Sequence, residues 1–274
     1  MSRSAVVDAA ADADLERRFG GLRRLYGEPA YTRIRAARIA VVGLGGVGSW
    51  AAEALARSGV AALTLIDFDH VAESNINRQV QALGATLGMA KGEALMRRIA
   101  DIHPGCEVRV VDAFVDAQNW PAMLGDPVDV VIDACDDPRA KLVLAAWARE
   151  NAAPLVIAGA AGGKRLPQEV AVADLAEVTH DPLLASLRQR LRKHHGAPGK
   201  GRFGLVCVFS REPVQRPQSG DGDDCALDGS LNCQGYGSSV SVTATFGMVA
   251  ASEALRLLPV AHTPPDIIAG LPGC

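Results

Sequence analysis

Residues 38–48 read RIAVVGLGGVG, and this segment decides the fold. After its arginine the run 38–42 is apolar and largely β-branched, as buried parallel strands are. The glycines that follow have the spacing G-x-G-x-x-G, which lets a backbone approach phosphate at the start of a helix. A helix is predicted over 47–58, Gly59 ends it, and residues 63–67 form the next predicted strand. The segment therefore predicts one βαβ unit of a nucleotide-binding sheet.

The same alternation of strands and helices continues along the chain. Further strands are predicted over 108–111, 128–133, 155–158, 168–173 and 203–209, and helices over 91–102, 139–151, 182–194 and 240–258. This pattern predicts an α/β, Rossmann-like fold: a mainly parallel sheet with helices on both faces and an antiparallel extension in the C-terminal part. We expect one domain over residues 1–260, with an N-terminal helical arm at about 12–36, a long loop over 211–239 and a tail over 261–274.

The composition is that of an ordinary soluble globular protein. Of the 274 residues 49% are apolar and 4% aromatic, and the net charge of −3 argues against binding nucleic acid through bulk charge. The start lacks the features of a signal peptide, and the most apolar stretch, 238–251, is shorter than the ~20 residues of a membrane span. The six cysteines form no Cys-x-x-Cys pair. We expect a cytoplasmic protein with reduced thiols and no membrane association.

A dense polar loop follows the second predicted strand, where ligands of open α/β sheets bind. Its residues are Asp67, Asp69, Asn75, Arg78 and Gln79, and Lys91 opens the next helix. Asp67 follows the glycines by about 20 residues, the usual place of a ribose-binding acid; a surface aspartate at a strand end is the alternative. Hydride transfer has no use for an arginine beside the phosphates, whereas nucleotidyl transfer needs preplaced cations. Arg78 and Lys91 are the candidate cations, with a solvated lysine as the alternative for Lys91.

A second acidic motif, Asp133-Ala-Cys-Asp136-Asp137, ends another predicted strand at the same sheet edge. Carboxylates there can hold Mg²⁺ while the metal bridges phosphates. Asp136 can also cap the helix that begins near Arg139, and the two roles are not exclusive. We interpret Cys135 as a packed strand-end residue.

In this order the motifs resemble the adenylation series of the E1-like superfamily, which includes the ThiF and MoeB type proteins. The resemblance implies an E1 adenylation fold that binds ATP and Mg²⁺. It places ATP over Gly43, Gly45, Gly46 and Gly48, the ribose on Asp67, the phosphates on Asn75, Arg78 and Lys91, and Mg²⁺ on Asp136, with Asp69 and Gln79 in the same site. A substrate carboxylate then attacks the α-phosphate to give an acyl-adenylate and pyrophosphate. Arg78, Lys91 and Asp136 are thus the candidate catalytic residues.

Other segments are similar to one branch of the superfamily, the tRNA threonylcarbamoyladenosine dehydratases. They are residues 18–21, 24–27, 47–57, 159–163, 181–183, 207–210 and 243–247. The similarity implies ATP-dependent activation of the threonine carboxylate of N6-threonylcarbamoyladenosine (t6A) at position 37 of tRNA, then ring closure to cyclic t6A with loss of one water. Superfamily members that activate a ubiquitin-like sulfur carrier usually have two Cys-x-x-Cys zinc pairs, which this chain lacks.

Three further sets of residues concern partners. A basic run is either a contact surface for the phosphates of the tRNA anticodon loop or a solvated helix face: Arg188, Arg190, Arg192, Lys193, Lys200 and Arg202. The resemblance implies a homodimer in which an N-terminal arginine enters the partner's ATP site; Arg18 and Arg24 are the candidates, and surface salt bridges are the alternative for both. It also suggests a cysteine desulfurase or its sulfur acceptor as a partner, with Cys233 as the candidate sulfur acceptor, although the acids near Cys233 do not favour a low thiol pKa.

The same motifs leave two other functions open. One is an E1-like adenylyltransferase for a ubiquitin-like sulfur carrier protein, and the other is a non-catalytic nucleotide-binding scaffold for sulfur transfer. An NAD-linked oxidoreductase rests on the glycine turn alone.

Overall fold

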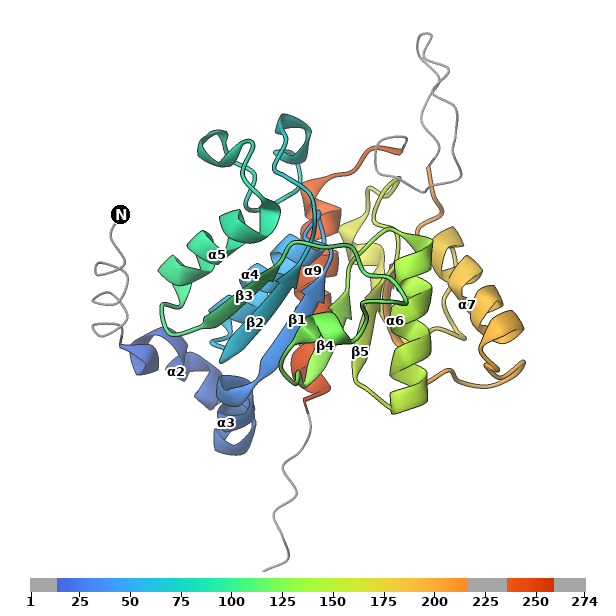
Figure 1. Ribbon diagram of the computed structural model, residues 1–274, viewed down its shortest axis with the longest axis horizontal. Helices are drawn as coiled ribbons and strands as arrows, with labels where there is room; N and C mark the ends of the chain where they lie inside the picture. Colours follow the sequence, from blue (N-terminus) through green and yellow to red (C-terminus); the bar gives the residue numbers. More distant parts are fainter. Residues whose placement is uncertain (1–13, 216–235, 259–274) are drawn as a thin grey trace, which may run out of the picture.

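The computed structural model describes residues 14–215 and 236–258 (Figure 1). Its strands are β1 (Arg38–Val42), β2 (Ala62–Ile66), β3 (Glu107–Val111), β4 (Val130–Asp133), β5 (Leu155–Ala158), β6 (Val170–Asp174) and β7 (Val206–Ser210). Its α-helices are α2 (Leu15–Tyr26), α3 (Glu28–Ala36), α4 (Gly48–Arg57), α5 (Lys91–Ile102), α6 (Pro138–Asn151), α7 (Pro182–His194) and α9 (Val240–Arg256). Short 3-10 helices are η1 (Glu73–Asn75), η2 (Gly84–Thr86), η3 (Ala122–Leu124) and η4 (Pro167–Glu169).

All seven strands belong to one sheet of order β3-β2-β1-β4-β5-β7-β6. Every neighbouring pair is parallel except β6 and β7, which are antiparallel. The predicted α/β fold with an antiparallel C-terminal extension is therefore confirmed. The chain runs outward from β1 to β3 and then returns to the other side of β1 with β4. Ligands of open α/β sheets bind at such a reversal, beyond the carboxyl ends of the strands.

Side chains of the central strands alternate between the two faces of the sheet, and both faces are buried. In β1, Ile39 and Val41 belong to one core cluster and Ala40 and Val42 to the other, as the two-residue period of a strand requires. The first cluster also contains residues of α4, α5 and α9, and the second contains residues of α6 and α7. Helices thus cover both faces of the sheet (Figure 1).

Most predicted boundaries agree with the structure, and the differences have local causes. The helices over 91–102 and 182–194 and the strand over 155–158 are confirmed at both ends. The last strand begins at Val206 and not at 203, because the N–H groups of Phe203 and Gly204 donate to the carboxylate of Asp174. The strand predicted from 168 begins at Val170, since η4 occupies the preceding residues.

Two expectations concern the C-terminal part of the chain. The predicted helix over 240–258 is α9, and no helix within the described ranges is both long and apolar enough to cross a membrane. The predicted tail over 261–274, the middle of the loop over 211–239 and Cys233 lie outside the described residues.

Candidate active site

A cavity of about 280 Å³ lies at the carboxyl edge of the sheet. Its walls are the loops that follow β1, β2, β3, β4 and β5, together with Lys91 of α5 and Thr243 of α9. Among the residues predicted from the sequence it gathers Gly43, Gly45, Gly46, Asp67, Asp69, Asn75, Arg78, Gln79, Lys91 and Asp136. Gly48 does not line the cavity and begins α4 directly behind it. Four separate sequence motifs thus converge on one site.

The glycines of the first turn serve two different purposes. Gly43 has a φ of +84°, and a Cβ there would lie 2.7 Å from the backbone nitrogen of Cys135, so the approach of the loop after β4 requires glycine. A Cβ at Gly48 would overlap the carbonyl oxygen of Gly43. Gly45 differs, because a Cβ there would meet no described atom within 4 Å. The space over Gly45 opens into the cavity, which fits a phosphate lying against the backbone.

Asp67, the residue after β2, binds the backbone of the glycine turn. One carboxylate oxygen accepts the N–H of Leu44 at 2.5 Å, and the other accepts the N–H of Asp69 at 2.8 Å. Burial raises the pKa of Asp67, while the nearby Lys91 ammonium and these two N–H groups lower it. The carboxylate is therefore fixed in orientation at the edge of the cavity, where a ribose hydroxyl can reach it.

Lys91 is a buried cation with carboxylate partners. Its Nζ lies 2.7 Å from Oδ2 of Asp69 and 3.9 Å from Oδ1 of Asp67. The sequence led us to expect phosphate as the partner that explains a lysine at a helix start, whereas here two aspartates neutralise it. Because the Asp69 side chain is 59% exposed, Lys91 can exchange this carboxylate for a phosphate without crossing the core.

Arg78 and Asn75 belong to the turn built around η1. The guanidinium of Arg78 donates through Nη1 to the carbonyl of Ser74 at 2.7 Å and to Oδ1 of Asn77 at 2.9 Å. Oδ1 of Asn75 accepts the N–H of Ala72 at 3.0 Å and so caps the turn. Both partners of the Arg78 guanidinium are within four residues of it in sequence. Arg78 can therefore turn toward an anion in the cavity without breaking a contact between distant parts of the fold.

Asp136 is exposed, lines the cavity, and is not the residue that caps α6. Asp137 is the N-cap, because its Oδ1 accepts the N–H of Arg139 at 2.8 Å. No group of three His, Cys, Asp or Glu side chains is arranged around a common point in the described part of the chain. Mg²⁺ bound to a nucleotide takes most of its ligands from phosphates and water, and one or two carboxylates suffice. Asp136 has the position and the exposure for that role.

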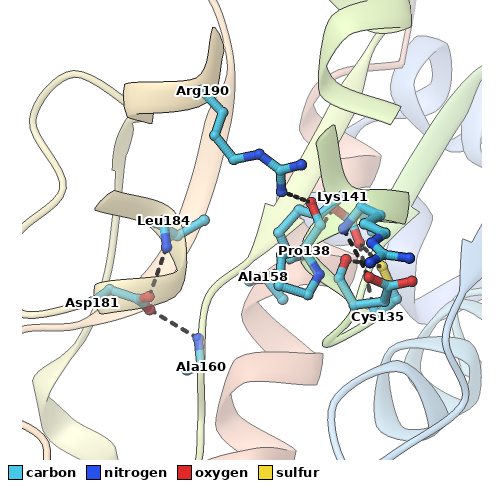
Figure 2. A network of polar contacts seen from close by, with 11 residues as sticks. Cys135, Pro138, Lys141, Ala158, Ala160, Asp181, Leu184 and Arg190 are labelled. Atoms are coloured by element: carbon cyan, nitrogen blue, oxygen red, sulfur yellow. Dashed lines mark hydrogen bonds and ion pairs between the residues drawn. The ribbon is translucent and has the colours of Figure 1, made fainter. Parts of the chain in front are cut away.

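Asp133, the first acid of this motif, is not available to a metal. Both its side chain and that of Lys141 are fully buried, with Nζ of Lys141 2.8 Å from Oδ2 of Asp133 and 3.0 Å from the carbonyl of Ala158 (Figure 2). The thiol of Cys135 donates to Oδ1 of Asp133 at 2.9 Å. Burial raises the pKa of Cys135 well above its usual range, so this thiol stays protonated.

Two features of the site were not predicted from the sequence. Lys141 is one of them, although a lysine near the start of a helix is unfavourable to the macrodipole and so signals a partner. The other is an aromatic pair on the rim: Phe68 and Phe114 have ring centroids 4.8 Å apart and both line the cavity. They come from the loops after β2 and β3, and only the fold brings them together. The pair offers an apolar surface to a nucleobase.

The basic run at α7 does not form one cationic surface. Arg188 donates to the carbonyls of Leu175 and Val178, and Arg190 donates to the carbonyl of Pro138 at 2.9 Å (Figure 2). Arg192 donates to the carbonyl of Pro198 and lies over the ring of Phe203. The remaining members, Lys193, Lys200 and Arg202, are exposed, and Nε of Arg202 lies 3.9 Å from Oδ2 of Asp174. Three of the six cations thus donate to backbone carbonyls of the fold, and a fourth faces a carboxylate.

Of the two candidate N-terminal arginines, one is bonded within the fold and the other is exposed. Arg18 donates through Nη1 to the carbonyls of Asp101 at 3.0 Å and Ile102 at 2.6 Å, at the C-terminal end of α5. Arg24 is exposed on α2. Arg18 therefore has a role within its own chain, and Arg24 is the arginine that is placed to reach outward.

The model of the ThiF family matches residues 20–270. The chain belongs to the ThiF family. It is 48% identical over 248 residues to the tRNA threonylcarbamoyladenosine dehydratase of Escherichia coli (strain K12), covering 87% of this chain and 92% of that relative. To the protein of the same name in Haemophilus influenzae it is 41% identical over 246 residues, covering 89% and 94%. The resemblance inferred from the motifs is thereby confirmed.

A solved dehydratase structure has the same fold. The crystal structure of Escherichia coli tRNA N6-threonylcarbamoyladenosine dehydratase in complex with ATP matches with a TM-score of 0.79 and 45% identity, covering 89% of this chain and 95% of that one. The molybdopterin-synthase adenylyltransferase of Escherichia coli (strain K12) is 36% identical over 123 residues, which is 45% of this chain. Similarity to the dehydratases thus extends about twice as far along the chain.

Proposed function

We propose that this chain is an ATP-dependent tRNA threonylcarbamoyladenosine dehydratase, which converts t6A at position 37 of tRNA into cyclic t6A. The observation that carries the proposal is the cavity, which holds the glycine turn, Asp67, Arg78, Lys91 and Asp136 together. The similarity to the dehydratases over most of the chain supports the choice of substrate. The sulfur-carrier activators share less than half of the chain's length and usually have zinc cysteine pairs that are absent from this sequence.

The proposed reaction has two steps on one carboxylate. An oxygen of the threonine carboxylate attacks the α-phosphorus of ATP, and pyrophosphate leaves. A nearby atom of the same modification then attacks the activated carbonyl, and AMP leaves, so that the nucleoside loses one water overall. The second step is intramolecular and requires mainly that the chain hold the substrate in the right orientation.

The residues of the cavity have separate tasks in this proposal. Asp67 holds the ribose, and the pair Phe68 and Phe114 covers the base. Arg78 and Lys91 neutralise the charge that develops on the phosphates, with Lys91 leaving Asp69 to do so. Asp136 holds Mg²⁺, which supplies further charge neutralisation on the phosphates.

The proposal includes the expected partners and location. The enzyme acts in the cytoplasm as a homodimer, and Arg24 is the better candidate for the arginine that enters the partner's site. Lys193, Lys200 and Arg202 are the exposed members of the basic run whose side chains donate to no backbone carbonyl in the described part of the chain, and they are the better candidates for tRNA phosphates. A cysteine desulfurase or its sulfur acceptor is the proposed sulfur partner, and Cys233 is its proposed contact.

The test is incubation of the protein with ATP, Mg²⁺ and tRNA that bears t6A, followed by mass spectrometry of the nucleosides. A modified nucleoside lighter by one water supports the proposal, provided that tRNA without t6A consumes no ATP. An unchanged mass with the intact protein rejects it. Pyrophosphate exchange that depends on a carrier protein ending in Gly-Gly would instead identify a sulfur-carrier activator.

A further inference from the structure

The cavity has two ends of different chemistry. At the end over β2 and β3 lie Asp67, Phe68 and Phe114, which suit a nucleoside. At the opposite end, after β5, the wall consists of residues 159–162, which are glycines and alanines, and of Leu183. This second wall contains no cation, so it does not suit phosphates. It adjoins the loop that bears Asp136, because β4 and β5 are neighbours in the sheet.

One buried carboxylate fixes this wall. Asp181 is 4% exposed, and its two oxygens accept two backbone N–H groups from different parts of the fold (Figure 2). Oδ1 accepts from Leu184 at 3.0 Å, which caps α7, and Oδ2 accepts from Ala160 at 2.8 Å, which lies in the wall. A Cβ at Gly159 would overlap Oδ2 of Asp181, so the glycine is needed for this close approach.

Capping alone does not account for an aspartate at this position. A serine hydroxyl caps a helix about as well and carries no charge into the interior. Burial raises the pKa of Asp181, which shows that its charged form is disfavoured there. The second bond joins Asp181 to Ala160, 21 residues away. A serine has one oxygen on a shorter side chain, which can cap α7 but cannot reach Ala160 at the same time. The carboxylate is thus explained by the link between α7 and the wall.

The base of the same wall is held from the other side. Lys141 donates to the carbonyl of Ala158, the last residue of β5, and to Asp133, the last residue of β4 (Figure 2). Lys141 thus links the start of the wall at Ala158 to the end of β4. Two residues further on, Asp181 links the wall to α7. A loop of glycines and alanines that is held at both points is preorganised, with little freedom left to lose on binding.

We propose that residues 159–162 form the acceptor side of the cavity, which receives the uncharged part of the threonylcarbamoyl group of the modified nucleoside while its carboxylate points toward the phosphates, and that Asp181 is the positioning residue that holds this wall in place. The inference rests on the proposed function, since it assigns the tRNA substrate to the end of the cavity that the nucleotide leaves free. Small residues there leave room for this group, and the bond of the Ala160 N–H to Asp181 fixes the path of the wall beside it.

The test variant is Asp181→Ser, which keeps a cap for α7 and removes the link to Ala160. We expect kcat/KM for tRNA bearing t6A to fall about 10- to 100-fold, mainly through KM, because small displacements at a positioned site have effects of this size. The Kd for ATP, measured by calorimetry, stays within a factor of about two. Gly159→Ala, which pushes Oδ2 of Asp181 away from the wall, reproduces the result if Asp181→Ser does not fold.

A matched control is Asp129→Ser. The half-buried carboxylate of Asp129 also joins two parts of the fold, because its Oδ2 accepts the N–H of Arg38 at 2.8 Å. Asp129 directly precedes β4 and Arg38 opens β1, so this bond lies at the amino edge of the sheet, opposite the cavity. Asp129→Ser lowers the melting temperature, whereas its KM for tRNA remains that of the wild type.

Three outcomes separate this inference from the proposed function. If the wild type converts t6A and both wall variants raise KM for tRNA while ATP binding persists, the inference stands. If the wild type converts t6A and the wall variants keep its KM for tRNA, or lose ATP affinity to the same extent as tRNA affinity, the inference is overturned. If the wild type does not convert t6A at all, the proposed function fails first.

Discussion

Lys141 and Asp133 form an ion pair with no exposed side-chain surface, 2.8 Å between Nζ and Oδ2. Burial alone would lower the pKa of Lys141, but the carboxylate of Asp133 raises it, so the ammonium form of Lys141 is favoured. The pair joins the ends of two neighbouring strands, since Lys141 also donates to the carbonyl of Ala158. The carboxyl ends of β4 and β5, from which two walls of the cavity start, are therefore coupled through a single ammonium group.

Lys141→Met should destabilise the protein severely. The substitution keeps the apolar stem but leaves Asp133 charged and buried, which typically lowers the free energy of unfolding by about 3–5 kcal/mol. Denaturant unfolding measures this loss. The double variant Asp133→Asn with Lys141→Met removes both charges and should recover part of it, because the two sites are coupled. Strictly additive losses would contradict the pairing.

Gly43→Ala should lower stability, whereas Gly45→Ala should weaken ATP binding, although the two glycines are only two residues apart. Gly43→Ala places a Cβ against Cys135 in a backbone with φ of +84°, so we expect a loss of stability of at least about 1–3 kcal/mol. Gly45→Ala places a methyl group in the open cavity and should leave the melting temperature unchanged while weakening ATP binding about tenfold or more. Thermal unfolding and calorimetric titration distinguish the two, and tight ATP binding by Gly45→Ala would remove this turn from the phosphate site.

Local sequence patterns predicted the scaffold because they depend on near neighbours. The β-branched run 38–42, the glycine spacing and the alternation of strands and helices each follow from the geometry of a few consecutive residues. The motif acids and cations were predictable as a set, since each follows a strand whose carboxyl end faces the same sheet edge. Their grouping in one cavity required only that the strands be parallel.

The contacts within the site were less predictable, because they join residues that are distant in sequence. Lys91 binds Asp69 across 22 positions, and Asp181 binds Ala160 across 21. The basic run shows the same limit. The sequence predicts Arg188 and Arg190 either as tRNA contacts or as part of a solvated helix face, but in the structure backbone carbonyls of Leu175 and Pro138 accept their guanidinium groups. Charge spacing predicts how many cations lie in a segment, and only packing determines which of them stay free.

Arg78→Ala should lower turnover by orders of magnitude and leave the fold intact. The side chain makes only local bonds to Ser74 and Asn77, and the contact of its backbone carbonyl with Nε1 of Trp50 survives the substitution. Loss of one preplaced charge at the phosphates should lower kcat by about 10²–10³. Arg97→Ala is the control, since Arg97 is an exposed residue of α5 paired with Glu93 away from the cavity. Wild-type rates from Arg78→Ala would remove Arg78 from the phosphate clamp.

His103 should make stability depend on pH below neutrality. Burial and the nearby Arg35 and Arg18 lower the pKa of His103 from 6.5 to about 4. The folded state therefore binds fewer protons than the unfolded chain, so stability is complete above about 6.5 and is lost as the pH falls toward 4. Denaturant unfolding between pH 7.5 and 4.5 should show this decline, and His103→Gln should reduce it. An equal pH slope in both proteins would refute the assignment.

Substitution of Arg18 should lower stability, whereas substitution of Arg24 should lower turnover. Arg18→Ala removes two hydrogen bonds to the last carbonyls of α5 and should lower the free energy of unfolding by about 1–2 kcal/mol. Arg24→Ala removes an exposed side chain, so stability should persist while turnover falls if Arg24 enters the site of a second subunit. Mixing Arg24→Ala with Arg78→Ala subunits then restores one complete site in each mixed dimer, about a quarter of wild-type turnover for random pairing. Recovery of activity on mixing would place Arg24 in the partner's site, and two inactive variants that stay inactive when mixed would exclude it.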